Sequence, residues 1–218
     1  MSKNGFTLAE VLITLGIIGV VAAITMPSLI KHYQQQVVIS RLKKFYTNIN
    51  QAIKMSEVEN GSCENWDMPT GDGNYVGLAF FNKYLANYLK YHDVSLSDIV
   101  TYDEHGNKNA IQRYLIKFAD GSAMTIHYSG GIDISFYIYA SKITDAQLGK
   151  NKFSFDFEKN NSKSKKCSVE PYTLTWDGTR EHLKTHPRYG CSETSIAKTF
   201  CAKLIQYDGW KISKDYPW

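Results

Sequence analysis

Two histidines, His182 and His186, stand four residues apart, the spacing that on a helix would present two imidazoles to a zinc ion. Pro187 follows directly, the neighbouring residues are typical of a loop, and no acid or third histidine is spaced to complete a ligand set. We therefore predict no metal and no cofactor. The local sequence shows no nucleophile motif and its carboxylates are scattered singly, so the pattern does not indicate an enzyme.

A glycine-rich stretch, GDGNYVG, has its glycines at positions 71, 73 and 77. This spacing differs from that of a phosphate-binding G-x-G-x-x-G loop, and no strand-like run precedes it. The stretch therefore predicts a turn rather than a nucleotide site.

Basic residues gather in a polar loop near residue 160 and reappear further along the chain. The net charge of +4, from 25 Lys and Arg against 21 Asp and Glu, is too small to indicate a nucleic-acid partner by itself. The loop could meet phosphate groups, but it lacks the interleaved aromatic residues that stack on bases. We do not favour nucleic acid as a partner of these residues, which are Lys159, Lys163, Lys165, Lys166, Arg180, Lys184 and Arg188.

The chain has four cysteines, an even number that favours two disulfides in an oxidising compartment over reduced thiols. We favour the pairs Cys63–Cys167 and Cys191–Cys201. The second pair has a condition, because an unbroken helix from residue 193 would separate its cysteines by about 13 Å or more. The pairing therefore requires that this helix begin late, near Thr199.

A single acid, Glu10, stands at the head of an apolar run with no other charge until Lys31. Val11–Ile30 contains 20 uncharged residues, about the length that crosses a bilayer core. No small-residue cleavage site of the secretory type ends the run, so we expect the segment to be retained. Gly16, Gly19 and Ala23 are small residues that would let helices approach closely there.

The helical pattern continues beyond the apolar run. Apolar side chains recur at steps of three and four residues, at Val38, Leu42, Phe45, Ile49 and Ile53. We predict one helix from about Phe6 to about Glu59, ended by Asn60-Gly61 and kinked at Pro27.

The remainder of the chain predicts an antiparallel sheet. Residues 61–110 are expected to be rich in loops, with short helical stretches near Leu78–Leu89. Strand-like alternation follows, with Asp-Gly and Gly-Gly turns between the first three runs, and a second helix is expected within residues 193–207. One sheet face is apolar and fits the stripe of the long helix, which gives an α+β fold. The four strand-like runs are Ile111–Phe118, Ala123–Tyr128, Ile132–Tyr139 and Phe153–Phe157.

Residues 5–10, GFTLAE, closely resemble the processing site of type IV prepilins and type II secretion pseudopilins. A short leader ends at Gly5, Phe6 begins the following segment, and Glu10 stands five residues into it. A long apolar run and Pro27 follow, as in many pilins. The resemblance implies that a prepilin peptidase cuts between Gly5 and Phe6 and methylates the new amine of Phe6. It also implies that Glu10 neutralises the freed amine of a neighbouring subunit.

The resemblance further implies a pilin-like fold and a structural role in a type IV pilus or a secretion pseudopilus. The expected partners are other pilin subunits, the peptidase, the membrane and an inner-membrane assembly platform. The precursor would cross the inner membrane once, with its C-terminal part outside the cytoplasm. The expected parts are a leader at 1–5, a transmembrane and filament-core helix at 6–30, its amphipathic half at 31–60 and a globular domain at 61–218.

Two other functions remain open from the sequence. The chain could be a minor pilin that binds DNA or another ligand through its globular domain. It could instead be a membrane-anchored extracytoplasmic enzyme that keeps its leader. Glu10 likewise has a simpler interpretation as an acid that stays in water at the membrane interface.

Overall fold

The computed structural model describes residues 5, 7–68, 74–103, 105–128, 131–159 and 167–218. The chain divides into two compact units, Met1–Val37 and Val38–Trp218. Helix α1, Leu8–Asn60, supplies most of the first unit and begins the second. It ends where predicted, because Gly61 adopts a positive φ of 73°, a conformation that stops a helix at low cost in glycine.

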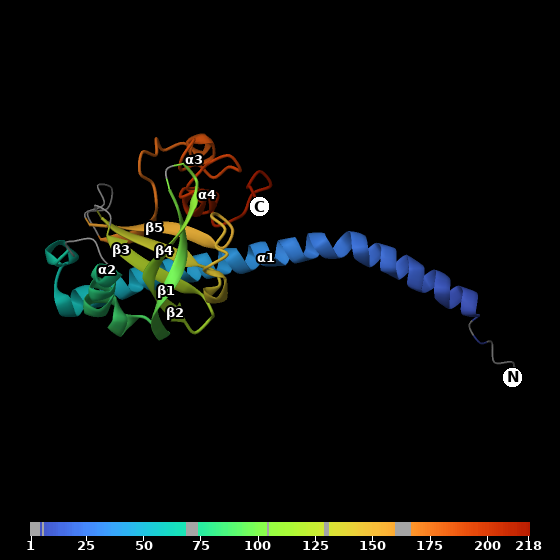
Figure 1. Ribbon diagram of the computed structural model, residues 1–218, viewed down its shortest axis with the longest axis horizontal. Helices are drawn as coiled ribbons and strands as arrows, with labels where there is room; N and C mark the ends of the chain where they lie inside the picture. Colours follow the sequence, from blue (N-terminus) through green and yellow to red (C-terminus); the bar gives the residue numbers. More distant parts are fainter. Residues whose placement is uncertain (1–4, 6, 69–73, 104, 129–130, 160–166) are drawn as a thin grey trace. The chain divides into compact units, whose positions relative to one another are not determined.

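The second unit contains an antiparallel sheet with the strand order β1-β2-β3-β4-β5-β6; Figure 1 labels strands β1 to β5. Every strand therefore pairs with its neighbour in sequence, which is the meander predicted from the turns. The strands are β1 (Tyr91–Tyr102), β2 (Lys108–Phe118), β3 (Ala123–Tyr128), β4 (Ile132–Tyr137), β5 (Lys152–Glu158) and β6 (Ser168–Pro171).

Two of these strands, β1 and β6, were not predicted, and β2 is longer than predicted. Strand β1 lies in the region expected to consist of loops, and β2 begins at Lys108, before the predicted start at Ile111. The turn between them is closed by Asp103, whose carboxylate accepts hydrogen bonds from the backbone N–H groups of His105 and Asn107. Such an aspartate turn is a hairpin signal that the sequence analysis did not use. Strand β6 has only four residues, too few to show alternation.

The apolar face of the sheet packs against α1, as predicted. Phe45 stacks on Phe136 with ring centroids 4.2 Å apart and meets the edge of Phe155 at 5.1 Å. Leu42 and Ile49 are each 0% exposed, so the stripe predicted from their spacing is the buried face of the helix.

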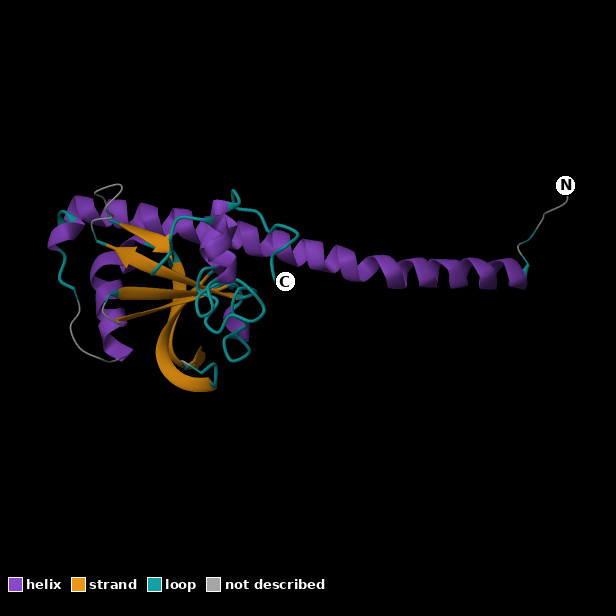
Figure 2. Cartoon of the chain, turned by 90° about the horizontal axis from the view of Figure 1, so that it is seen from above, coloured by secondary structure: helices purple, strands orange, loops and turns teal. Residues whose placement is uncertain are grey.

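The opposite face of the sheet is buried as well, which corrects the expectation of a single covered face. Thr125, Ser135 and Lys152 point to this face and are all buried. The far end of β1 reaches across it, because the Lys152 ammonium donates a hydrogen bond to the Val100 carbonyl at 2.9 Å. The C-terminal helix α4 (Cys201–Tyr207) contacts β5 and β6. Figure 2 shows helices and loops on both sides of the strands.

A short helical region precedes β1. Helix α2 (Asn74–Phe80) continues as a π-helical turn (Phe81–Leu85) and a 3₁₀ turn (Ala86–Tyr88). The helical stretch therefore begins at Asn74, earlier than the predicted Leu78. Gly77 belongs to α2 and not to a turn, which corrects the interpretation of GDGNYVG; positions 71 and 73 lie outside the described residues. A Cβ atom at Gly77 would lie 1.8 Å from the Ile126 carbonyl oxygen, so glycine permits α2 to approach β3 this closely.

Both favoured disulfides are present in the structure. Cys63–Cys167 joins the segment after α1 to the start of β6 across 104 residues, and Cys191–Cys201 closes a loop of 10. The condition on the second pair is met, because α4 begins only at Cys201 and the two Cα atoms lie 4.8 Å apart.

Candidate functional site

The first candidate site is the N-terminus of α1, where Thr7 and Glu10 cap the helix together. The Glu10 carboxylate oxygen Oε2 accepts hydrogen bonds from the Thr7 backbone N–H and the Thr7 hydroxyl, both at 2.8 Å. The Thr7 hydroxyl oxygen in turn accepts a bond from the Glu10 backbone N–H at 3.3 Å. This is the reciprocal capping box, and its carboxylate also lies at the positive end of the helix dipole.

Thr7 was not singled out from the sequence, although the signal was present. A threonine followed three residues later by glutamate, directly before an apolar run, is the sequence signature of a capping box. In the single chain, Glu10 is exposed and its carboxylate is hydrogen-bonded to Thr7. Both bonds from Thr7 reach Oε2, and no donor among the described residues reaches Oε1. Gly5 is exposed, and Phe6 lies outside the described residues.

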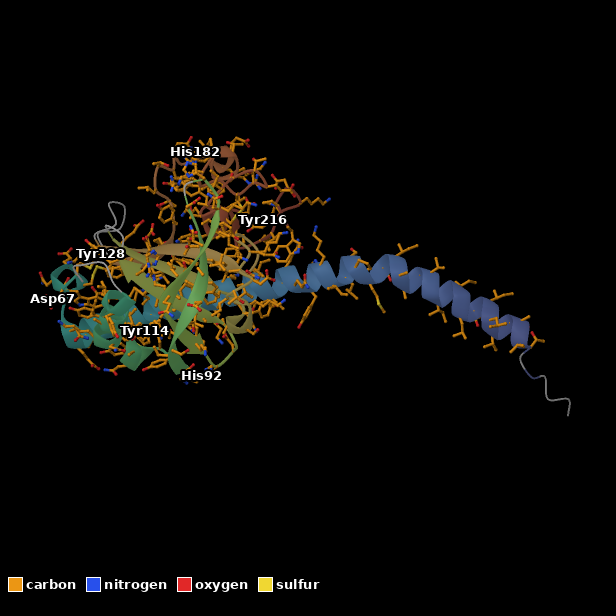
Figure 3. The ribbon with its side chains drawn as sticks, in the orientation of Figure 1. Asp67, His92, Tyr114, Tyr128, His182 and Tyr216 are labelled. Atoms are coloured by element: carbon orange, nitrogen blue, oxygen red, sulfur yellow. A yellow bond between two sulfur atoms is a disulfide. The ribbon has the colours of Figure 1, made fainter. Side chains whose placement is uncertain are left out.

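Behind this cap, α1 is apolar all round. Leu12, Ile17 and Ile18 point in different directions around the helix and are 61%, 59% and 61% exposed. Two threonines within this run hydrogen-bond to the helix itself, since Thr14 and Thr25 donate their hydroxyls to the Val11 and Val21 carbonyls, each at 2.9 Å. Among the described residues, α1 is the one helix long and apolar enough to cross a membrane. Figure 3 shows its side chains.

The small residues and the proline of this segment lie along the same exposed surface. A Cβ atom built at Gly16 or Gly19 would meet nothing within 4 Å, so these positions leave room for another helix. Pro27 lies inside α1, which continues through it. Because proline has no N–H, one carbonyl of the preceding turn loses its partner within the helix.

Two family models match the chain. Residues 1–26 match the prokaryotic N-terminal methylation motif, which is typical of type IV pilins and pseudopilins. Residues 28–218 match the model of a family of unknown function, DUF6613. The chain belongs to this family. No curated protein and no solved structure matches it. The long helix and the antiparallel sheet give the DUF6613 chain an α+β, pilin-like fold.

The two histidines of the sequence analysis lie on a helix and its cap, which corrects the expectation of a loop. Helix α3 (Arg180–Thr185) contains His182, and His186 is the residue that ends it. Nδ1 of His182 accepts the Asp177 backbone N–H at 3.1 Å, and Nδ1 of His186 accepts that of Tyr189 at 3.0 Å. One nitrogen of each ring is therefore already bound to the backbone.

Most of the described basic residues are already engaged within the DUF6613 chain. Arg180 forms ion pairs with Asp208 at 2.6 Å and with Asp215 at 3.0 Å, and Lys184 lies 2.9 Å from Asp215. The ammonium of Lys159 donates to the Trp66 carbonyl at 3.0 Å. Arg188 lies over the Tyr189 ring. These contacts explain the residues structurally; Lys163, Lys165 and Lys166 lie outside the described residues.

A second site was missed, because the carboxylates that looked scattered in the sequence meet in the sheet. Asp133 on β4 and Asp156 on β5 are direct cross-strand partners. His127 on β3 is the partner of Asp133, with Nε2 and Oδ2 3.5 Å apart, and Glu170 on β6 is the partner of Asp156. The four residues form a row across four strands, which we call the acid row. The alternation in each strand was visible, but not which strands would be neighbours.

Proposed function

We propose that the DUF6613 chain is a structural subunit of a type IV pilus or a secretion pseudopilus. A prepilin peptidase would cut it between Gly5 and Phe6 and methylate Phe6, and the mature chain would then polymerise through the first half of α1. The observation that carries this proposal is an apolar helix exposed on every side, headed by a carboxylate of which one oxygen has no donor among the described residues. Such a helix needs lipid before assembly and neighbouring helices afterwards.

Distances along the helix explain the position of Glu10. From Phe6 to Ile30 the helix would measure about 37 Å, against a hydrocarbon core of about 30 Å. Glu10 then lies about one turn from the cytoplasmic end, where water still reaches it in a single subunit. In a filament core water is excluded, and an unpaired carboxylate would cost several kcal/mol.

The amine released by cleavage supplies the partner that the carboxylate then needs. A cation at about 4 Å contributes about 4 kcal/mol at an intermediate effective dielectric constant. Oε1 of Glu10 can accept this amine while Oε2 keeps its bonds to Thr7, since a carboxylate has four acceptor positions. A subunit in the correct axial register gains this interaction, and a subunit out of register does not.

The test is the variant Glu10→Gln. Glutamine fills the same place in a capping box, so the helix cap is retained and only the charge is removed. We expect normal cleavage, a stable membrane-held protein, and at least about a hundredfold less incorporation into filaments, since about 1.4 kcal/mol is tenfold. The measurement is the yield of sheared filaments beside a blot for the processed chain. Asp98→Asn, which removes an exposed acid on β1, is the matched control and should assemble normally.

Two results would contradict the proposal. Filaments that contain Glu10→Gln at the wild-type level would make Glu10 a helix cap and nothing more. A mature chain that still begins at Met1 would exclude processing and would favour the membrane-anchored enzyme. N-terminal sequencing decides the second point, and we expect methylated Phe6 as the first residue.

A further inference from the structure

The acid row places negative charge where a sheet tolerates it least. Cross-strand partners have Cβ atoms about 4.5–5.5 Å apart, and like charges at that distance are destabilising. Asp133 and Asp156 are such partners, and Glu170 continues the row on the far side of Asp156. Oδ1 of Asp156 is buried and receives no hydrogen bond from the described residues. Both aspartates are half-buried, so water screens them only in part.

Among the described residues, no lysine or arginine forms an ion pair with Asp133 or Asp156. The neighbouring side chains are Arg113 on β2, His127 on β3, Lys152 and Glu158 on β5, and Tyr172, Arg188 and Tyr189 after β6. The ammonium of Lys152 is turned to the Val100 carbonyl instead. Glu170 accepts hydrogen bonds from the neutral Tyr46 hydroxyl and the Gln206 amide. Oδ2 of Asp133 lies 3.5 Å from Nε2 of His127.

His127 cannot supply the missing positive charge near neutral pH. Burial first, and then the charges of Arg113 and Lys152, lower the pKa of this imidazole to about 4. Its contact with Asp133 is therefore one of a neutral ring with a carboxyl group. Burial, and then the neighbouring Asp133 and Glu158, raise the pKa of Asp156 to about 8. Burial also raises the pKa of Asp133.

We propose that Asp133 and Asp156 share one proton and act as a pH-sensitive latch for strand β6 and the segment that follows it. With the proton present, one carboxyl group donates to the other and the row holds together. When the proton is lost, adjacent carboxylates stand on β4 and β5, beside Glu170 on β6, and no described lysine or arginine forms an ion pair with either aspartate. Strand β6 opens first, because it is a four-residue strand at the edge of the sheet. Tyr172 directly follows β6 and lies close enough for both aspartates to raise its pKa.

The sign of the pH dependence follows from proton binding. The folded chain keeps a proton on Asp156 over a range in which the unfolded chain has lost it. The free energy of unfolding therefore falls as the pH rises from about 4, where the unfolded carboxyl ionises, and it stops falling above the folded pKa of about 8. Strand β6 is therefore held in the sheet at mildly acidic pH, where the aspartates share a proton, and opens at alkaline pH, where they do not. This inference does not depend on polymerisation.

The first test compares Asp156→Asn with the wild-type full chain in detergent, with a chelator present, from pH 5 to pH 8.5. Asparagine mimics the protonated carboxyl group and cannot lose a proton. We expect the melting temperature of the variant, relative to wild type, to rise by roughly 5 °C between the two pH values. Asp98→Asn should run parallel to wild type. A difference between variant and wild type that stays constant with pH would overturn the proposal.

The second test locates the opening. Amide hydrogen exchange is measured by mass spectrometry at pH 6 and pH 8.5 and corrected for the intrinsic pH dependence of exchange. We expect about tenfold more opening of residues 168–172 at the higher pH in wild type and no such increase in the variant. Asp133→Asn is the second variant, because removing either charge should abolish the effect if Asp156→Asn fails to fold. Equal changes in wild type and variant would mean that the pair is not a latch.

Discussion

Residues 8–30 and 38–56 of α1 use similar apolar side chains for opposite purposes. In the first stretch these side chains surround the helix and remain exposed; Ile18 is 61% exposed. In the second they form one stripe, and Ile49 on that stripe is 0% exposed. The partner of the second stretch is the sheet of the same chain, whereas the described residues of the first unit leave the side chains of the first stretch exposed. A helix with one apolar stripe packs that stripe against the core of its own chain. A helix that is apolar on every side needs lipid or other chains around it.

Removing the disulfide Cys63–Cys167 should give the largest loss in the free energy of unfolding. Both cysteines lie in the second unit, so the first unit should be unaffected. Replacing Cys63 and Cys167 with serine should lower the free energy of unfolding by about 4.7 kcal/mol on a chain-entropy estimate. Replacing Cys191 and Cys201 should cost about 2.7 kcal/mol on the same estimate, because the closed loop is far shorter. Denaturant titration of the two double variants measures both. A larger loss for the short loop would show that chain entropy does not set the order.

Matched substitutions along α1 should sharpen the comparison next. Ile49→Ala leaves a cavity against the sheet and should cost about 3 kcal/mol in the free energy of unfolding. Ile18→Ala removes the same atoms from an exposed position and should change it by less than about 0.5 kcal/mol. Chemical unfolding is followed by the near-ultraviolet signal of tryptophan, which reports on the second unit because all 4 tryptophans lie there. Equal losses in the two variants would mean that the first stretch also packs on the sheet.

Local patterns were sufficient for most of the fold. The stripe of α1, the Asp-Gly and Gly-Gly turns and the alternation of β4 each depend on neighbouring residues, and the structure confirms the α+β meander. Strand β1 escaped because only Ile99 and Val100 along it are buried, so its alternation is weak. The burial of the second sheet face could not be predicted, because it depends on the C-terminal helices and the curled end of β1, which arrive from elsewhere in the chain.

The two candidate sites differ in the same way. The cap formed by Thr7 and Glu10 lies within four residues and was readable as a motif, even though only Glu10 was noticed. The acid row brings together four strands, and its members are separated by up to 43 positions, from His127 to Glu170. The partner of Asp156 could be named only once the register of β4, β5 and β6 was known. Residue spacing along the sequence cannot reveal a site that depends on how neighbouring strands are aligned.

The smallest expected effect concerns the basic loop, where we predict no change in assembly. Changing Lys163, Lys165 and Lys166 to glutamine removes three charges from a polar segment that sequence composition places in solvent. Filament yield should remain at the wild-type level, because the proposed assembly surface is the first half of α1.

The same variant also tests cargo binding, since Arg180 and Lys184 are already paired with Asp208 and Asp215. These three lysines are therefore the best candidates for a phosphate contact. If the wild-type chain is retained on DNA in low salt and the variant is not, the loop binds cargo. If the variant instead forms no filaments while its second unit still unfolds at the wild-type temperature, the loop is a subunit interface. The second unit would then take part in assembly, and the first half of α1 would not be the whole assembly surface.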